Sequence, residues 1–98
     1  MAKIELPQLN ECRPEVIRMA RVMEYKLRLN DHKGGWKNGM PLWFLTRLAE
    51  EVGELSKAVR TCPHNDPRVH FEAADVANFA MMVADIMYPI IGEVEDRG

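Results

Sequence analysis

A chain of 98 residues has the size of one small domain, so residues 1–98 are treated as a single domain. The 13 lysines and arginines are matched by 15 aspartates and glutamates, and this balance argues against a surface for a nucleic-acid polymer. The two cysteines, Cys12 and Cys62, form no disulfide framework and lack metal-ligand spacing, which indicates reduced thiols in a cytoplasmic protein.

Membrane association is not expected either. The segment Met1–Pro7 lacks the apolar core of a signal peptide. The longest apolar run, Val76–Ala84, is too short to span a bilayer and is flanked by Asp75 and Asp85.

The first predicted helix covers residues 14–30, after an irregular lead-in at residues 1–13. Pro14 suits the first position of a helix, where its missing N–H is not needed. An apolar stripe at helical spacing is expected to face the core, and it consists of Val16, Met19, Ala20, Met23 and Leu27. The charged residues are expected on the outer faces, and they are Arg18, Arg21, Glu24, Lys26 and Arg28.

The principal loop, Asn30–Gly39, follows this helix. Its glycine pair at 34–35 permits backbone conformations that are closed to other residues. The loop also contains Lys33, Trp36 and Lys37, so it is cationic and aromatic at once.

The second predicted helix covers residues 41–61, because Pro41 can open it and Pro63 disfavours helix at the residue before it. Its expected core stripe consists of Leu45, Leu48, Ala49, Val52, Leu55 and Val59. The charged residues expected well round from that stripe are Arg47, Glu50, Glu51 and Glu54.

The third predicted helix covers residues 67–88, with Asp66 as a plausible N-cap. Pro89 ends or kinks it, and residues 93–98 read as a frayed, solvated tail. Residues 76–84 are apolar nearly all round, which is typical of a buried helix.

The third helix therefore has more apolar circumference than two neighbouring helices can cover. No strand pattern competes with the helices. The predicted fold is all-α, an antiparallel helical bundle that is completed by oligomerisation into a homo-oligomer, a dimer or a tetramer.

Five acidic residues form two compact clusters, one on each of the last two helices. Residues three or four apart share a helix face, so Glu50, Glu51 and Glu54 gather on one helix. Glu72 and Asp75 gather on the other, at the head of its apolar run. Facing carboxylates repel one another unless a cation lies between them, and hard oxygen ligands suit Mg²⁺, with Mn²⁺ as a substitute.

Each cluster has a purely structural explanation when it is taken alone. Glutamates on a helix usually form a solvated face, and acids near a helix N-terminus are favoured by its dipole. Neither explanation accounts for five acids in this spacing, so the combined pattern favours metal binding. Asp85 is better explained as a polar contact near the helix end than as a sixth functional acid.

The pattern Glu50-Glu51-x-x-Glu54, seventeen intervening residues, then Glu72-x-x-Asp75 resembles the signature of the all-α nucleoside triphosphate pyrophosphohydrolases, the MazG-like superfamily. The loop Asn30–Trp36 and the run Glu72–Met82 further resemble a single-domain subgroup that is common in phages and enterobacteria.

The resemblance implies an all-α fold in which the five acids hold Mg²⁺. It implies hydrolysis of a (deoxy)nucleoside triphosphate to the monophosphate and pyrophosphate, in control of the nucleotide pool. It also implies a dimer or a tetramer, and a location in the host cytoplasm if a phage encodes the chain.

For that reaction, one carboxylate that is not fully used as a ligand can take a proton from water, and Glu50 or Glu51 is the candidate. Lys33, Lys37 and Arg47 are candidates to neutralise phosphates. Trp36 either stacks on the base or only packs the loop onto the core. Asn78 is a candidate to hydrogen-bond the sugar or a ligand water.

A purine substrate is a weak preference, and the sequence leaves open which phosphorus is attacked. The competing hypothesis is a non-catalytic helical oligomer that binds a nucleotide or a partner. A third hypothesis is a purely structural oligomer, in which replacing Glu72 or Asp75 by alanine would affect no ligand.

Overall fold

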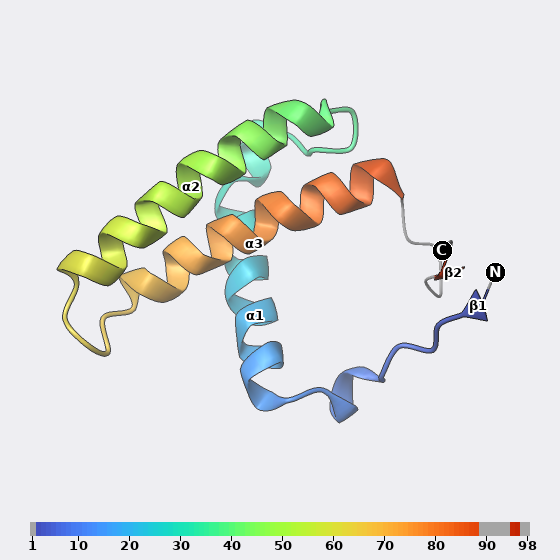
Figure 1. Cartoon of the computed structure of the whole chain (residues 1–98), viewed down its shortest axis with the longest axis horizontal. Coiled ribbons are helices and arrows are strands. Elements are labelled where there is room, and N and C mark those ends of the chain that lie inside the picture. Colours follow the sequence, from blue (N-terminus) through green and yellow to red (C-terminus); the bar gives the residue numbers. More distant parts are fainter. Residues whose placement is uncertain (1, 89–94, 97–98) are drawn as a thin grey trace.

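Three α-helices make up most of the structure, a computed structural model that describes residues 2–88 and 95–96. They are α1 (Pro14–Leu29), α2 (Pro41–Thr61) and α3 (Arg68–Met87), and their bounds lie within one residue of the predicted ones. The all-helical character of the chain is thereby confirmed. Helices α2 and α3 run antiparallel side by side, and α1 crosses α3 at a steep angle (Figure 1).

Local chemistry explains where the helices begin and end. Pro14 and Pro41 occupy first-turn positions, where no N–H is required. The side chain of Asn30 donates to the carbonyl of Lys26 at 3.1 Å and so closes the last turn of α1. The N-cap position of α3, predicted at Asp66, is occupied by Pro67. Asp66 lies one residue earlier, and its Oδ1 accepts the backbone N–H of Arg68 at 2.9 Å.

The chain also forms short elements that the sequence pattern did not predict. The lead-in contains a 3-10 helix, η1 (Leu9–Glu11), and the main loop contains another, η2 (Asp31–Lys33). Two-residue strands β1 (Ala2–Lys3) and β2 (Glu95–Asp96) pair antiparallel. Apart from β2, the predicted frayed tail lies outside the described residues, as does the break predicted at Pro89.

The interior of the described part of the chain is small. Its buried residues are Phe44, Ala58, Ala74 and Asn78. In α2 the residues that face α3 include Phe44, Glu51 and Ala58, which share one helical stripe. Phe44 and Phe79 of α3 lie with ring centres 6.1 Å apart across this interface.

The predicted core stripe of α2 was therefore partly wrong. Leu45, Ala49, Val52 and Val59 are exposed, whereas Leu48 and Leu55 are half-buried. Helix α2 has two apolar stripes that are one residue apart in the sequence, and the stripe that packs on α3 contains Glu51. A search for apolar residues at helical spacing misses this stripe, because an acid interrupts it.

The predicted stripe of α1 was also partly wrong. Val16 and Ala20 are exposed, whereas Met19, Met23 and Leu27 are half-buried. Because α1 crosses α3 instead of running alongside it, the helix cannot bury its full length (Figure 1).

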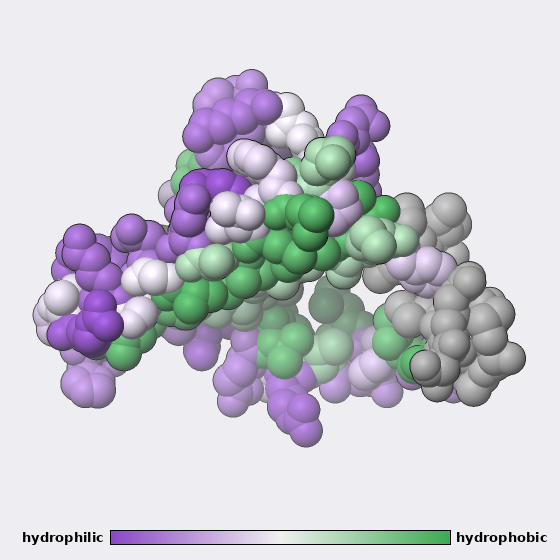
Figure 2. All heavy atoms as spheres, turned by 45° about the horizontal axis from the view of Figure 1, so that its top comes forward, coloured by the Kyte–Doolittle hydropathy of each residue, from purple (hydrophilic) through white to green (hydrophobic). Residues whose placement is uncertain are grey.

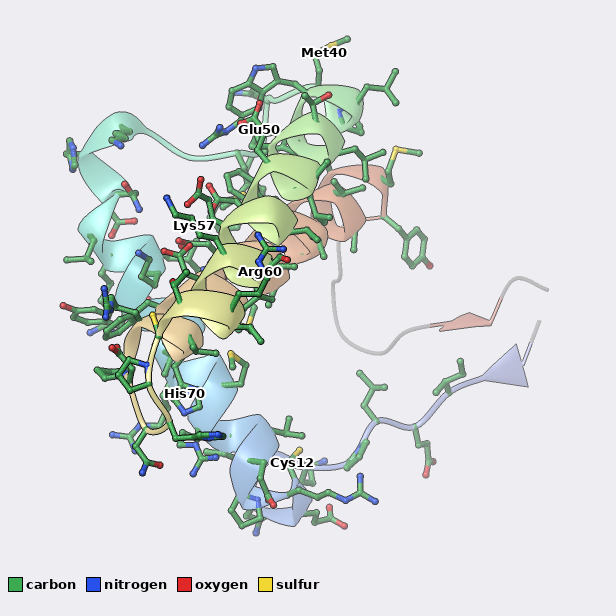
Figure 3. The ribbon with its side chains drawn as sticks, turned by 60° about the vertical axis from the view of Figure 1, so that its left-hand side comes forward. Cys12, Met40, Glu50, Lys57, Arg60 and His70 are labelled. Carbon is green, nitrogen blue, oxygen red and sulfur yellow. The ribbon has the colours of Figure 1, made fainter. Side chains whose placement is uncertain are left out.

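The second apolar side of α2 forms a band on the surface, visible as the green stripe that runs obliquely across Figure 2. Leu45, Val52 and Val59 lie seven residues apart, which keeps them on one helix face, and we call them the outer stripe. Val59 is the most open of the three, at 62% exposed. At the N-terminal end of α2, Met40 also points outward (Figure 3).

No helix in residues 2–88 is long and apolar enough to cross a membrane.

Candidate functional site

Three of the five predicted acids meet between α2 and α3. Glu51 comes from α2, and Glu72 and Asp75 come from the first turns of α3. Each offers one carboxylate oxygen, and these oxygens all lie within 4.8 Å of one another. All three side chains are half-buried, so water screens their mutual repulsion less than it would at an open surface.

The electrostatics of Glu51 reflect this crowding. Burial raises the pKa of Glu51, and the neighbouring carboxylate of Asp75 raises it further, with smaller effects of the same sign from Glu72 and Glu54. Arg47 opposes the shift. The cluster therefore favours the arrival of positive charge, either as a proton or as a cation.

The structure separates the other two predicted acids from this cluster. Glu50 and Glu54 are exposed on α2, and Figure 3 shows Glu50 on that helix. Glu50 pairs with Arg47 one turn before it. Since each helical step turns by about 100°, only Glu51 of the three can point directly at α3 when the helix packs on Phe44 and Ala58.

Two cations lie against the cluster, and the sequence identified only one of them as functional. Arg47 Nη2 lies 3.4 Å from Glu51 Oε1, and its guanidinium carbon is 5.6 Å from the centre of the Phe79 ring. Lys26 Nζ lies 3.4 Å from Asp75 Oδ2.

The prediction that Lys26 lies on an outer face was wrong, because its side chain is only 22% exposed. Lys26 follows Met19 and Met23 at spacings of seven and three, so it continues the half-buried stripe of α1. A lysine that continues an apolar helix stripe, in a chain whose other helices contain clustered acids, is the sequence signal that would have identified Lys26.

A pocket of about 630 Å³ opens beside the acids. Its charged lining comes from Lys26, Asp31, Lys33, Arg47, Glu51 and Asp75. Its aromatic lining comes from Trp36, Trp43, Phe44 and Phe79. Of these aromatic residues, only Trp36 was predicted as a site residue. Phe44 and Phe79 belong to the interface between α2 and α3 that the predicted stripe missed.

The loop between α1 and α2 forms one side of the pocket through residues 30–36. Gly34 has φ of +88°, a conformation that favours glycine. Gly39 lies so close to the Phe44 ring that a Cβ there would overlap it. Of the predicted phosphate-binding lysines, Lys33 lines the pocket, whereas Lys37 is exposed and pairs with Asp85.

Asn78 lines the pocket three residues after Asp75. It is only 4% exposed, and its amide nitrogen donates to the carbonyl of Met23 at 3.0 Å. Its Oδ1 has no hydrogen-bond partner within the described residues. Because a buried acceptor without a partner is costly, this oxygen is suited to receive a donor from a bound molecule.

The geometry thus combines oxygen ligands for a hard cation, cations for an anion, and aromatic rings for a flat apolar group. No protein-family model matches the chain, and no curated protein and no solved structure is significantly similar to it.

Proposed function

We propose that this chain is a Mg²⁺-dependent nucleoside triphosphate pyrophosphohydrolase of the MazG-like superfamily, which releases a monophosphate and pyrophosphate. The observation that supports the proposal most directly is the cluster of Glu51, Glu72 and Asp75, two of which, Glu51 and Asp75, line the pocket. These residues belong to the acidic motif on which the resemblance rests. A cytoplasmic location and a role in nucleotide-pool control are part of the proposal.

The three clustered acids would hold the metal, because each offers a carboxylate oxygen close to those of the other two. The raised pKa of Glu51 supports this assignment, since a divalent cation would relieve the repulsion that causes it. When bound, Mg²⁺ supplies a Lewis acid that attracts the polyphosphate and makes water easier to deprotonate. Glu50 and Glu54, which are exposed on α2, would then contribute negative charge near the metal without binding it directly.

Of the two predicted general bases, Glu51 is better placed. Glu51 lines the pocket, whereas Glu50 is exposed and paired with Arg47.

The other pocket residues would each contact a different part of the substrate. Arg47, Lys33 and Lys26 would neutralise phosphate oxygens. The aromatic residues would take the base, since base–aromatic stacking requires only a flat ring. Asn78 Oδ1 would accept a hydrogen bond from a sugar hydroxyl.

The decisive experiment is a panel of common and modified nucleoside triphosphates, incubated with and without Mg²⁺, with products separated by chromatography. The proposal predicts monophosphate plus pyrophosphate, only with metal, and at least about 100-fold less product from the Glu51→Gln variant. Release of orthophosphate instead of pyrophosphate would contradict the proposed reaction.

One observation favours the alternative of a non-catalytic nucleotide- or partner-binding oligomer. Arg47 and Lys26 already pair with two of the clustered acids, as they would in a stable structural network. The same panel separates the two functions. A folded protein that binds Mg²⁺ and nucleotide but yields no product would support the alternative.

We also propose that the outer stripe binds a second copy of the chain. Leu45 and Val52 are each 45% exposed and Val59 is 62% exposed, so this face leaves a continuous apolar patch open to water, and such patches mark association sites. A second copy offers the same apolar helix face, so the interface would be self-complementary.

A further inference from the structure

Asp85 connects the main loop to the far end of α3. Its Oδ2 accepts the indole N–H of Trp36 at 2.9 Å and the ammonium of Lys37 at 2.5 Å. Trp36 and Asp85 are 49 residues apart in the chain. Asp85 therefore links the loop to α3, two segments that lie far apart in the sequence.

The contact is well suited to hold an aromatic ring in place. The Asp85 side chain is 19% exposed, and hydrogen bonds to an ionised carboxylate are stronger than those between neutral groups. Lys37 Nζ lies 5.3 Å from the centre of the Trp36 ring. The edge of the indole is thus fixed by Asp85, and one of its faces is covered by the ammonium that Asp85 also binds.

The loop has little else of this kind. Its backbone hydrogen bonds within the described residues are local ones, such as Gly34 N–H to the Asp31 carbonyl and Gly39 N–H to the Trp36 carbonyl. The neighbouring glycines, Gly34 and Gly35, can adopt backbone conformations that are closed to other residues. Among the described residues, Asp85 accepts the hydrogen bond that ties the Trp36 ring to α3.

We propose that Asp85 is a positioning residue that holds Trp36 as a wall of the pocket, and that it thereby makes the pocket prefer a purine to a pyrimidine. This inference rests on the proposed function, since it assigns the aromatic lining to the base. Trp36 lines the pocket together with Phe44 and Phe79, whereas Lys37 does not. A larger base overlaps more of a fixed ring, so it loses more when the ring is released.

The first test measures the position of Trp36 without any nucleotide. The chain has two tryptophans, so in a Trp43→Phe background the fluorescence comes from Trp36 alone. Adding Asp85→Ala should shift the emission to longer wavelength and increase quenching by acrylamide. Asp85→Asn, which keeps an acceptor oxygen, and Lys37→Ala, which leaves the indole bond, should change the emission less. Unchanged emission in Asp85→Ala would overturn the positioning role.

The second test measures binding of non-hydrolysable purine and pyrimidine nucleoside triphosphate analogues, with inorganic triphosphate as the probe that lacks a base. Asp85→Ala should reduce the purine-to-pyrimidine preference by about tenfold and leave the affinity for inorganic triphosphate unchanged. Trp36→Phe should have a similar effect, and combining the two changes should add little, because both remove one interaction.

The outcomes separate this inference from the proposed function. A wild-type protein that hydrolyses nucleotides but prefers pyrimidines, or an Asp85→Ala variant that keeps the wild-type preference, overturns the inference alone. A wild-type protein that neither binds nor hydrolyses any nucleotide overturns the proposed function and the selectivity with it, whereas the fluorescence test of Trp36 still stands or fails by itself.

Discussion

The ammonium nitrogen of Lys26 on α1 lies 3.4 Å from a carboxylate oxygen of Asp75 on α3. The helix that contributes none of the predicted acids therefore reaches the acidic cluster. Both side chains are more than three-quarters buried, so the pair is less screened by water than an ordinary surface ion pair. Any cation that binds Asp75 must compete with Lys26 or displace it.

The first prediction concerns Lys26→Met, which keeps the apolar stem and removes the charge. Without nucleotide, the affinity for Mn²⁺ measured by calorimetry should rise about fivefold, because a competing cation is gone. The affinity for a non-hydrolysable nucleoside triphosphate should fall about tenfold, because a phosphate contact is lost.

Arg28→Met is the matched control, since Arg28 lies two residues further along α1 and pairs with Glu24 at the surface. It should change neither affinity. A Lys26→Met variant that loses affinity for metal and nucleotide alike would show instead that Lys26 supports the fold.

The second prediction concerns Glu51→Gln. Turnover should fall by at least about 100-fold, and the rise in melting temperature that millimolar Mg²⁺ gives the wild type should be lost. Because the folded state raises the pKa of Glu51, this residue destabilises the fold progressively as the pH rises from its unfolded pKa to the raised one, and fully above the raised one. In the absence of metal at neutral pH, the variant should therefore melt at a higher temperature than the wild type.

Glu54→Gln is the control, because Glu54 is exposed on the same helix. It should retain most of the metal-induced stabilisation. Equal losses in the two variants would mean that all five acids act together, and that the separation between Glu51 and the exposed pair has no functional meaning.

The sequence predicted the helices well and their contacts less well. Proline positions and turn signals determine helix bounds locally, so the bounds of α2 at Pro41 and Thr61 matched. The burial of α2 could not be predicted in the same way. Its two apolar sides, one through Phe44 and one through Val52, have similar patterns, and only the packing of α3 decides between them.

In the candidate site, too, local spacing was predictable from the sequence and contacts between segments were not. Spacing within one helix brought Glu72 and Asp75 together, because residues three apart share a face. That Glu51 joins them while Glu50 does not depends on how α2 is rotated against α3. The contributions of Lys26 and Asp85 depend on long-range contacts from α1 and the loop, which no local pattern contains.

The third prediction tests the outer stripe. Val52→Glu places a charge at the centre of the outer stripe and should reduce the proposed oligomer to a monomer, because an unpaired charge cannot be buried cheaply in an interface. Sedimentation velocity measures the change directly. Val16→Glu, the same substitution at an exposed valine of α1, should leave the oligomer intact. A wild-type chain that is already monomeric at high concentration would contradict the proposed interface.

The fourth prediction is a pH dependence at the start of α3. The Arg68 side chain, and then its backbone N–H, lower the pKa of Asp66 by hydrogen bonding to the carboxylate. A lowered folded-state pKa means that the ionised group stabilises the fold above the unfolded value, about 3.9 for aspartate. That stability is lost as the pH falls through the folded-state pKa.

Asp66→Asn keeps an oxygen that can cap the helix but removes this charge. Its melting temperature should therefore lie below that of the wild type at neutral pH, and the difference should shrink as the pH falls through the lowered pKa and vanish in stronger acid. Thermal melts followed by circular dichroism between neutral and strongly acidic pH measure it. Glu24→Gln, which breaks a surface pair with Arg28, should show a smaller difference at neutral pH because both partners are exposed. A difference for Asp66→Asn that stays constant across the pH range would mean that Asp66 acts only as a neutral cap, and that its pairing with Arg68 adds nothing to the stability of α3.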